Sequence, residues 1–244
     1  MIIYGRNATK EAILSEQTFN KLYVDKNCRD KTSEEIISLA KENNIKINFV
    51  ERKILDQKFK GKEKVAHQGF VAEIVDFEYS ELEDIFDVAK QKNEPPFIII
   101  LDGVEDPHNL GAIIRTAECA GASGVIIPEH RACAVNDTVL KTSAGAASLV
   151  KVVRVTNLND CIEKLKKLGV WVYAMEAEGE NLWKANLTGP IAIVMGSEGS
   201  GVSKLTKQKC DGIISIPMFG KINSLNVSVA TAISTYEILR QRNK

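Results

Sequence analysis

Asn109, Gly111 and Arg115 follow an apolar run, and their residue types could bind a polar ligand. Pro107 and Gly111 favour a turn, and Asn109 is suited to cap the helix that follows it. Gly111 and Arg115 are i and i+4, so one face of the first helical turn is bare beneath a guanidinium, a group that holds anions. We expect Arg115 to project into a cleft, although a capped helix with a surface arginine would give the same pattern.

Two further segments of similar composition follow later apolar runs. Residues 194–202 contain Gly196, Gly199 and Gly201, and this density of glycine lets a backbone approach a ligand closely. Their G-x-x-G-x-G spacing differs from the dinucleotide fingerprint G-x-G-x-x-G, and the sequence lacks a G-K-[ST] phosphate loop. Residues 214–230 place small polar side chains before the last helix, where they could cap it or contact a ligand. Each segment alone is weak evidence for a site.

The elements that must position these segments form a regular pattern from Phe97 onward. Continuous apolar runs of strand length alternate with helical patterns, which is typical of a parallel sheet with helices on both faces. We expect strands at residues 97–101, 124–128, 152–155, 170–175, 191–195 and 213–216, and helices at 110–120, 137–142, 158–168 and 226–242. Sheets of this kind bind ligands beyond the carboxyl ends of their strands, where all three segments lie.

The first 76 residues predict a separate, smaller α/β unit. Helices are expected at 7–14, with Asn7 as N-cap, and at 33–44, and strands at 21–25, 45–50 and 70–75, with a polar loop at 58–69. Residues 77–96 form an acidic amphipathic pattern that ends in two prolines. The sequence therefore predicts domains at 1–76 and 97–244, joined by an acidic linker helix that could also be the first helix of the second domain.

Charge is balanced over the chain, with 32 Lys and Arg residues against 32 Asp and Glu residues. A strongly basic nucleic-acid binder would not have this composition. Basic side chains nevertheless gather in residues 52–64, which contain Arg52, Lys53, Lys58, Lys60, Lys62 and Lys64 against Asp56 and Glu63. This basic run is either a solvated face or a loop that contacts phosphate groups.

Composition also disfavours several classes of protein. No apolar run approaches the roughly 18 residues of a membrane span, and the N-terminus lacks the apolar region of a signal peptide. The five cysteines are scattered without C-x-x-C spacing, so neither a disulfide framework nor a zinc site is indicated. We expect a cytoplasmic protein with reduced thiols, no membrane association and no metal.

The three segments are much more specific together than separately. They read D-G-V-x-D-P-x-N-x-G-x-x-x-R, then M-G-x-E-x-x-G, then I-P-M-x-G-x-x-x-S-L-N-V-S-x-A, within residues 101–230. In this order they resemble the three motifs of the SpoU (TrmH-like) RNA ribose 2′-O-methyltransferases. Residues 141–146 also resemble the family's K-x-S-x-G-A segment, whereas Ser197 stands where many relatives have asparagine.

The resemblance implies an architecture and a chemistry. Family members have an α/β-knot domain, a parallel-sheet domain whose C-terminal part threads through a loop to form a deep trefoil knot. They bind S-adenosylmethionine and form obligate homodimers. The I-Y-G-x-N-x-x-x-E-A start and the H-Q-G segment at His67, Gln68 and Gly69 look like the L30e-like RNA-binding domain of the subgroup that methylates a guanosine in 23S rRNA. The implied partners are RNA and a second copy of the chain.

The same resemblance implies the roles of individual residues. Arg115 would lie at the ribose hydroxyl and its flanking phosphate, with Asn109 and Glu198 orienting the arginine or the ribose. Guanidinium groups keep their protons at physiological pH, which favours positioning over proton abstraction, but both roles stay open. The cofactor would be held by Met195, Gly196, Ile216, Pro217, Met218, Ser224 and Leu225. Contacts with RNA would come from Asn226, Ser143, Lys58, Lys60 and Lys62.

Alternative functions exist inside and outside this enzyme class. A tRNA ribose methyltransferase would more often lack the first 76 residues, and a methyltransferase for adenosine in rRNA would share the motifs. A non-catalytic RNA-binding protein would have lost Arg115, Asn109 or the cofactor glycines, which are all present. A nicotinamide-dependent oxidoreductase is disfavoured because the dinucleotide fingerprint is missing.

Overall fold

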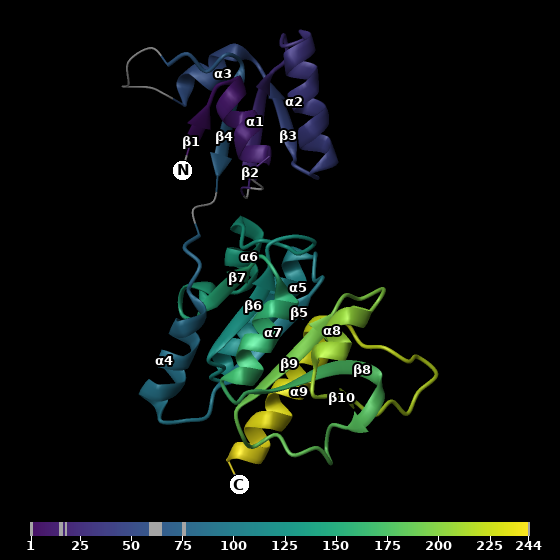
Figure 1. The fold of residues 1–244 in the computed structure, drawn as a ribbon. Coiled ribbons are helices and arrows are strands. Elements are labelled where there is room, and N and C mark those ends of the chain that lie inside the picture. The colour runs from purple at the N-terminus through teal and green to yellow at the C-terminus, as the bar shows by residue number, and fades with distance from the viewer. Residues whose placement is uncertain (1, 15–16, 18, 59–64, 75–76, 244) are drawn as a thin grey trace. The chain divides into compact units, whose positions relative to one another are not determined.

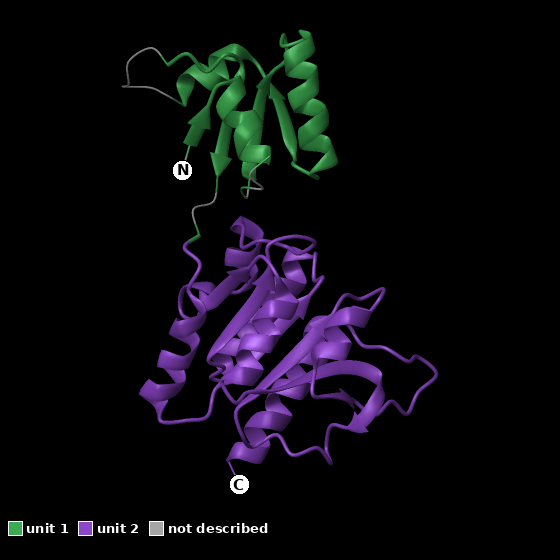
Figure 2. Cartoon of the chain, in the orientation of Figure 1, with its two compact units in different colours: residues 1–77 green, residues 78–244 purple. Residues whose placement is uncertain are grey.

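The chain folds into two compact units. The computed structural model describes residues 2–14, 17, 19–58, 65–74 and 77–243. Within it, Met1–Phe77 form one unit and Glu78–Lys244 the other, shown in green and purple in Figure 2. Each unit has its own sheet and its own buried core, so we describe each unit by itself.

The first unit is a small α/β domain. Its elements are β1 (Ile2–Tyr4), α1 (Arg6–Leu14), β2 (Phe19–Asp25), α2 (Lys31–Glu42), β3 (Ile47–Val50), α3 (Arg52–Gln57) and β4 (Phe70–Ile74). The sheet order is β1-β4-β2-β3, with β2 and β3 parallel and β4 antiparallel to both of its neighbours (Figure 1). The fully buried side chains of Leu22, Val24, Ile36 and Phe70 form the centre of its core.

Two helix starts in this unit differ from the prediction. α1 begins at Arg6 and not after Asn7, because the Gly5 carbonyl accepts hydrogen bonds from the N–H and the hydroxyl of Thr9 (3.1 and 2.8 Å). α2 begins after Asp30, whose carboxylate caps it by accepting from the N–H of Ser33 at 3.2 Å. The short helix α3, which carries the start of the basic run, was not predicted because it spans less than two turns.

The second unit is built on a six-stranded sheet in which all paired strands are parallel. The strands are β5 (Phe97–Asp102), β6 (Gly124–Pro128), β7 (Val152–Val155), β8 (Trp171–Asn181), β9 (Ile191–Gly196) and β10 (Gly212–Ser215). Their order is β10-β8-β9-β5-β6-β7, so the strand order reverses between β9 and β5. Residues 98–101 of β5 are completely buried, as expected of a central strand covered on both faces.

Helices cover both faces of this sheet (Figure 1). They are α4 (Leu82–Lys92), α5 (Pro107–Cys119), α6 (Asp137–Thr142), α7 (Leu158–Lys167), α8 (Lys204–Lys209) and α9 (Val227–Arg242), with a short 3-10 helix at Ala146–Ser148. On one face, Ile85 of α4 and Ile162 of α7 pack against Ile98 and Ile100. On the other face α5 and α9 contact each other, and they hold the polar residues described below.

The acidic segment is the first helix of the second unit. α4 begins with a capping box formed by Glu81 and Asp84, and it ends at Asn93 in the left-handed conformation. Ile85 is fully buried in the core of the sheet. Of the two possibilities that the sequence left open, a packed helix is therefore the one that the structure contains.

The start of α5 corrects a prediction that bears on the site. The helix begins at Pro107, and its N-cap is Asp106, whose carboxylate accepts from the N–H of His108 at 3.1 Å. Asn109 therefore lies inside the first turn and is not the cap. Its side chain does not cap the helix and bonds with residues outside α5.

The predicted fold class is confirmed for both units, a small α/β domain followed by a parallel-sheet α/β domain. The trefoil knot that the resemblance implies stays a prediction. Within the described parts of the chain, no helix combines the length and the apolar character needed to cross a membrane.

Candidate active site

The first two motif segments leave the sheet side by side. β5 ends at Asp102 and β9 at Gly196, and these two residues are partners in the parallel register. The segment after β5 leads into α5, while the segment after β9 closes a tight loop in which Ser197 and Gly201 exchange two backbone hydrogen bonds (3.1 and 3.0 Å). The two segments therefore leave the sheet where the strand order reverses, which is the usual place for a ligand site in an open α/β sheet.

Side chains from all three segments meet in one polar cluster, Asn109, Glu198 and Asn226, which we call the amide–carboxylate triad. Glu198 Oε1 accepts a hydrogen bond from Asn109 Nδ2 at 2.9 Å and another from Asn226 Nδ2 at 2.7 Å. Asn226 Nδ2 also lies 3.0 Å from Asn109 Oδ1. Two amides that are far from Glu198 in the sequence thus hold its carboxylate in a fixed position.

The orientation of Asn226 follows from its place in α9. Asn226 is the N-cap of that helix, and its Oδ1 accepts from the N–H of Ser228 at 2.9 Å and of Val229 at 3.4 Å. Because the amide oxygen is committed to the cap, the NH₂ group must face the other way, toward Glu198. A local capping rule therefore sets the geometry of a long-range contact.

A cavity of about 200 Å³ lies between the second and third segments. Every predicted cofactor residue except Pro217 lines it: Met195, Gly196, Ile216, Met218, Ser224 and Leu225. The sequence did not indicate Met175, Glu176 and Ala177, which β8 adds to the lining. These three residues were not predicted as part of a site because the strand was expected to end at Met175, whereas β8 continues to Asn181.

A second cavity, of about 620 Å³, opens beside the first. It is lined by residues 102–106 after β5, by Pro128, His130 and Arg131 after β6, by the loop after β9, and by Asn109. Ser197, Glu198, Gly201 and Val227 line both cavities. The carboxylate of the triad therefore lies at the boundary between the two cavities.

Arg115 lies on α5 but outside both cavities. Its side chain is exposed, it is not among the residues that line either space, and no described residue accepts a hydrogen bond from it. An α-helix turns by about 100° per residue, so the step of six residues from Asn109 to Arg115 places the two side chains on different faces. The projection into the cleft that we expected is not found within a single chain.

Gly111 and Ser143 serve packing in this structure. A Cβ at Gly111 would lie 2.6 Å from Thr142 Cβ and 3.1 Å from Ser143 N, so the glycine lets α6 pack closely on α5. The bare helix face expected beneath Arg115 is therefore filled by protein. Ser143 is fully buried and its hydroxyl donates to the Leu140 carbonyl at 3.1 Å, which leaves it inaccessible to RNA in this conformation.

The basic run is only partly described. Lys58 Nζ contacts Glu73 Oε1 at 2.5 Å and lies 3.9 Å from the centre of the Tyr23 ring. Partial burial opposes the charge of Lys58, but the bonds to Glu73 and Tyr23 outweigh it and raise the pKa of the ammonium group. Lys58 is thus engaged within its own unit and is not a free phosphate ligand. Lys60 and Lys62 lie outside the described residues.

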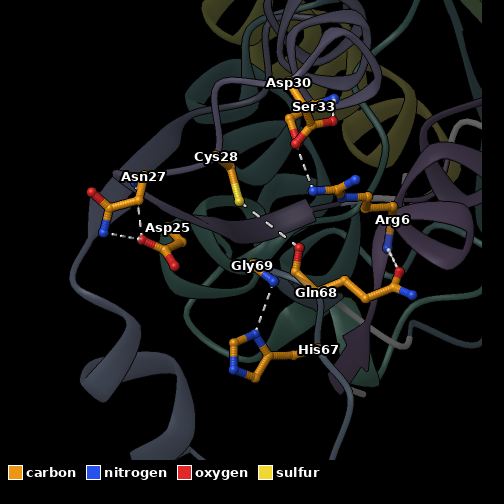
Figure 3. Close-up of polar contacts among 9 residues, drawn as sticks. All are labelled: Arg6, Asp25, Asn27, Cys28, Asp30, Ser33, His67, Gln68 and Gly69. Atoms are coloured by element: carbon orange, nitrogen blue, oxygen red, sulfur yellow. Dashed lines mark hydrogen bonds and ion pairs between the residues drawn. The ribbon is translucent and has the colours of Figure 1, made fainter.

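The H-Q-G segment lies in another polar cluster, at the end of the first unit's sheet where β2 finishes and β4 begins (Figure 3). We call it the turn cluster; it contains Arg6, Asp25, Asn27, Cys28, Asp30, Ser33, His67, Gln68 and Gly69. Gln68 and Gly69 both have positive φ angles (50° and 85°). The N–H of Gly69 donates to His67 Nδ1 at 3.0 Å, and Gln68 Oε1 accepts from the N–H of Arg6 at 3.2 Å. These contacts shape the turn that leads into β4.

Two chemistries receive no support from the described residues. No group of three or more His, Cys, Asp or Glu side chains among them is arranged to hold a metal ion. Burial raises the pKa of the Cys133 thiol, next to the second cavity's loops, to about 12. That thiol is protonated at neutral pH and would be a poor nucleophile.

Comparison with known families identifies the class of protein that this fold and site define. The SpoU rRNA Methylase family matches residues 96–236, and a family described as RNA 2′-O ribose methyltransferase substrate binding matches residues 2–80. The chain belongs to the SpoU family of RNA methyltransferases, as the three motifs predict. The two matches coincide closely with the two compact units.

Individual relatives extend the comparison. YacO of Bacillus subtilis, whose name places it in the TrmH family of tRNA/rRNA methyltransferases, is 44% identical over 99% of this chain and 96% of its own. The SpoU methyltransferase AviRb from Streptomyces viridochromogenes, solved in complex with the cofactor AdoMet, has the same fold, with a TM-score of 0.63 at 22% identity over 100% of this chain and 90% of its own. A TrmH/SpoU tRNA modifying enzyme from A. aeolicus, with a TM-score of 0.57 at 30% identity, covers 66% of this chain and 83% of its own.

Proposed function

We propose that this protein transfers a methyl group from S-adenosylmethionine to the ribose 2′-oxygen of a guanosine in 23S rRNA. The observation that carries the proposal is the position of Glu198, held by two amides at the boundary of two cavities. A methyl transfer needs its donor and its acceptor in adjacent sites, and two cavities that share Glu198 in their walls provide that arrangement.

The smaller cavity suits the proposed cofactor. Met175, Met195, Ile216, Met218 and Leu225 give it an apolar lining, which fits an adenine ring and a methionine chain. Gly196 and Gly201 also line this cavity, but a Cβ at Gly196 would lie 2.0 Å from the carbonyl carbon of Gly201, and a Cβ at Gly201 would lie 2.8 Å from Glu176 Oε1. These two glycines therefore allow the loop after β9 to close tightly, and the close approach to a ligand that their density predicted is not what they serve in this structure. Bound in that cavity, S-adenosylmethionine would supply an electrophilic methyl on a sulfonium that leaves as a neutral thioether.

The triad would then orient the acceptor ribose. Glu198 Oε1 is occupied by both amides, whereas Oε2 has no hydrogen-bond partner among the described residues, so it can accept the hydrogen bond of a ribose hydroxyl. Fixing the hydroxyl in this way aligns its oxygen for in-line attack on the methyl carbon, and the carboxylate can take the hydroxyl proton as the C–O bond forms and the C–S bond of the sulfonium breaks. Arg115 would contribute phosphate contact and positioning, as the resemblance implies.

We also propose that the protein acts as a homodimer. On α9, Val229, Ile233 and Tyr236 form an exposed apolar stripe at helical spacing, and Phe219 and Ile222 in the preceding segment are 88% and 76% exposed. A contiguous apolar surface of this kind is typical of an interface. Because α9 contacts α5, a second copy on this face would lie near Arg115, which the single chain leaves outside its cavities.

Two observations favour rRNA as the substrate, and we propose that the reaction takes place in the cytoplasm. The first unit matches a substrate-binding family over residues 2–80, and an added domain suits a large, structured RNA. The tRNA modifying enzyme from A. aeolicus matches only 66% of this chain. The alternatives are a tRNA ribose and an adenosine in rRNA.

The decisive experiment combines purified protein with mapping in cells. The protein should bind S-adenosylmethionine and methylate unmodified 23S rRNA transcripts, and one 2′-O-methylguanosine in 23S rRNA should vanish from cells that lack the gene. A lost methyl group in tRNA, or on an adenosine, would select one of the alternatives. Cofactor-binding protein that methylates no RNA would contradict the proposal, and light scattering on the full chain tests the dimer.

A further inference from the structure

The proposed function places the acceptor in the larger cavity, but neither the motifs nor the comparisons say which residues beyond Asn109 and Glu198 would hold it there. Its walls come from three neighbouring strand ends, after β5, β6 and β9. The loop after β6 is fixed against the loop after β5, because the N–H of Cys133 donates to the Val104 carbonyl at 2.9 Å. The cavity is therefore formed by joined loops, and its volume of about 620 Å³ is in the range of small-molecule sites.

Most of the carboxylates in its lining already have partners. Asp102 accepts from the N–H of Ser203 at 2.8 Å, Asp106 caps α5, and Glu198 belongs to the triad. Glu105 is exposed and has no hydrogen-bond partner among the described residues. A lining with four carboxylates repels a phosphate group from the interior but accepts hydrogen bonds from sugar hydroxyls and from base N–H groups.

One guanidinium lies in the same lining. Arg131 is exposed, and no described residue forms an ion pair or a hydrogen bond with its side chain. Its backbone has a positive φ of 56°, which is uncommon for a residue other than glycine and costs free energy unless the surroundings enforce it. Its carbonyl lies 3.9 Å from the position of a Cβ at Gly103, so the residue sits directly beside the loop after β5.

We propose that the larger cavity binds the target nucleotide of the RNA, with Arg131 holding the phosphate of that nucleotide at the rim. The inference rests on the proposed function. The ribose then reaches Glu198 at the boundary with the cofactor cavity, and the base occupies the carboxylate-lined part, where Glu105 can accept from its N–H groups. Arg131 is a binding residue in this arrangement, since it holds the phosphate and takes no part in the methyl transfer.

Substitutions of Arg131 test the proposal in the full-length protein. With unmodified 23S rRNA transcript as the probe, Arg131→Gln should weaken RNA binding about tenfold and lower the salt dependence of binding by about one phosphate contact. The KM for RNA should rise while kcat at saturating RNA changes less than about threefold. Arg131→Lys should keep the salt dependence and lose only part of the affinity, because a point charge replaces a two-pronged contact.

Lys184→Gln is the matched control, since Lys184 is exposed in the same unit and lines neither cavity. It should leave RNA affinity unchanged. The affinity for S-adenosylmethionine, measured by calorimetry, should be the same in the parent and in all three variants, which reports that the fold is intact. Ethylation interference on the parent protein needs no variant: an ethylated phosphate beside the target nucleotide should block binding.

The outcomes separate this inference from the proposed function. If the parent methylates RNA and Arg131→Gln matches it in affinity and salt dependence, the inference is wrong and the proposed function stands. If ethylation beside the target nucleotide leaves binding unchanged, the inference is likewise wrong. If the parent binds cofactor and methylates no RNA, the proposed function fails first.

Discussion

The amide–carboxylate triad of the second unit and the turn cluster of the first unit are both polar, but they are built differently. In the triad every contact joins two side chains, and the partners are 28 to 117 residues apart. In the turn cluster most contacts involve a backbone group, such as the N–H of Arg6, Asn27, Ser33 or Gly69. Side chain–side chain hydrogen bonds are the minority in proteins.

The difference indicates what each cluster does. Bonds from side chains to nearby backbone groups stabilise turns and helix ends, so the turn cluster builds structure. The Glu198 carboxylate is held only by side chains at the boundary of two cavities, so its bonds cap no helix and close no turn, which is what our proposal of a ligand role requires. Substitutions in the triad should therefore change activity, and substitutions in the turn cluster should change stability.

The largest expected effect is at Arg115. Arg115→Ala should lower methyl transfer at least about a hundredfold, or roughly 2.7 kcal/mol, and Arg115→Lys should restore little of it. Folding and S-adenosylmethionine binding should be nearly unchanged. Single-turnover assays on unmodified 23S rRNA fragments at saturating cofactor measure the rate. A variant that keeps more than about a tenth of the parent rate would move the active centre toward Glu198 and Asn226.

A smaller loss of rate is expected at Glu198. Glu198→Gln preserves shape and leaves an amide oxygen for Asn109 and Asn226, but it removes the charge that would hold the ribose hydroxyl. Methyl transfer should fall by about thirtyfold, while the free energy of unfolding should change by less than about 1 kcal/mol. Denaturant titration and the single-turnover assay measure the two quantities. A large loss of stability with little loss of rate would reverse the contrast between the clusters.

In the turn cluster, Gly69→Ala should affect stability and not chemistry. A Cβ at Gly69 would lie 2.2 Å from Cys28 Sγ, and the φ of 85° disfavours any side chain. The opening free energy of the first unit should fall by about 2 kcal/mol, as measured by hydrogen exchange of its peptides. Cofactor affinity should be unchanged.

Two controls sharpen that prediction. Cys28→Ala combined with Gly69→Ala should recover part of the loss, because the sulfur is then absent. Gly189→Ala should be neutral, since no atom lies within 4 Å of its Cβ position. If the peptides of the first unit exchange their amide hydrogens at the same rate in Gly69→Ala as in the parent, the turn does not depend on the glycine.

The smallest effect is expected at Lys58. Because its ammonium group is engaged with Glu73 and Tyr23, Lys58→Met should lower the stability of the first unit by about 1 kcal/mol or less and leave RNA affinity unchanged. Joint replacement of Lys60, Lys62 and Lys64 by glutamine should weaken RNA binding and flatten its salt dependence. Filter binding at several salt concentrations compares the two variants. If Lys58→Met weakens RNA binding as much as the joint replacement does, Lys58 contacts a phosphate group and the prediction is wrong.

Much of the fold was predictable because its signals are local. The apolar run at residues 97–101 predicted β5 to within one residue, and the acidic pattern at residues 77–96 predicted the existence of α4, although the helix itself is shorter, Leu82–Lys92. The errors are also local in origin. Asn109 is a residue type that favours the N-cap position, but Asp106 is another, and Pro107 favours the first position of a helix. The helix therefore begins earlier, with Asp106 as its N-cap. α3 and α8 are too short to show a helical period.

The sequence by itself determined the family, the order of the motifs and six of the residues that line the smaller cavity, because a motif records residue types that must face one ligand. Tertiary structure decided which of those residues meet. The register of Asp102 with Gly196 brings two segments together, and the α9 cap turns Asn226 toward Glu198. The same structure leaves Arg115 on another face of α5 and encloses Gly111 and Ser143 in packing. Spacing along a chain fixes a residue's neighbours within one helix, whereas contacts between elements depend on how the sheet is ordered and how the helices pack on it.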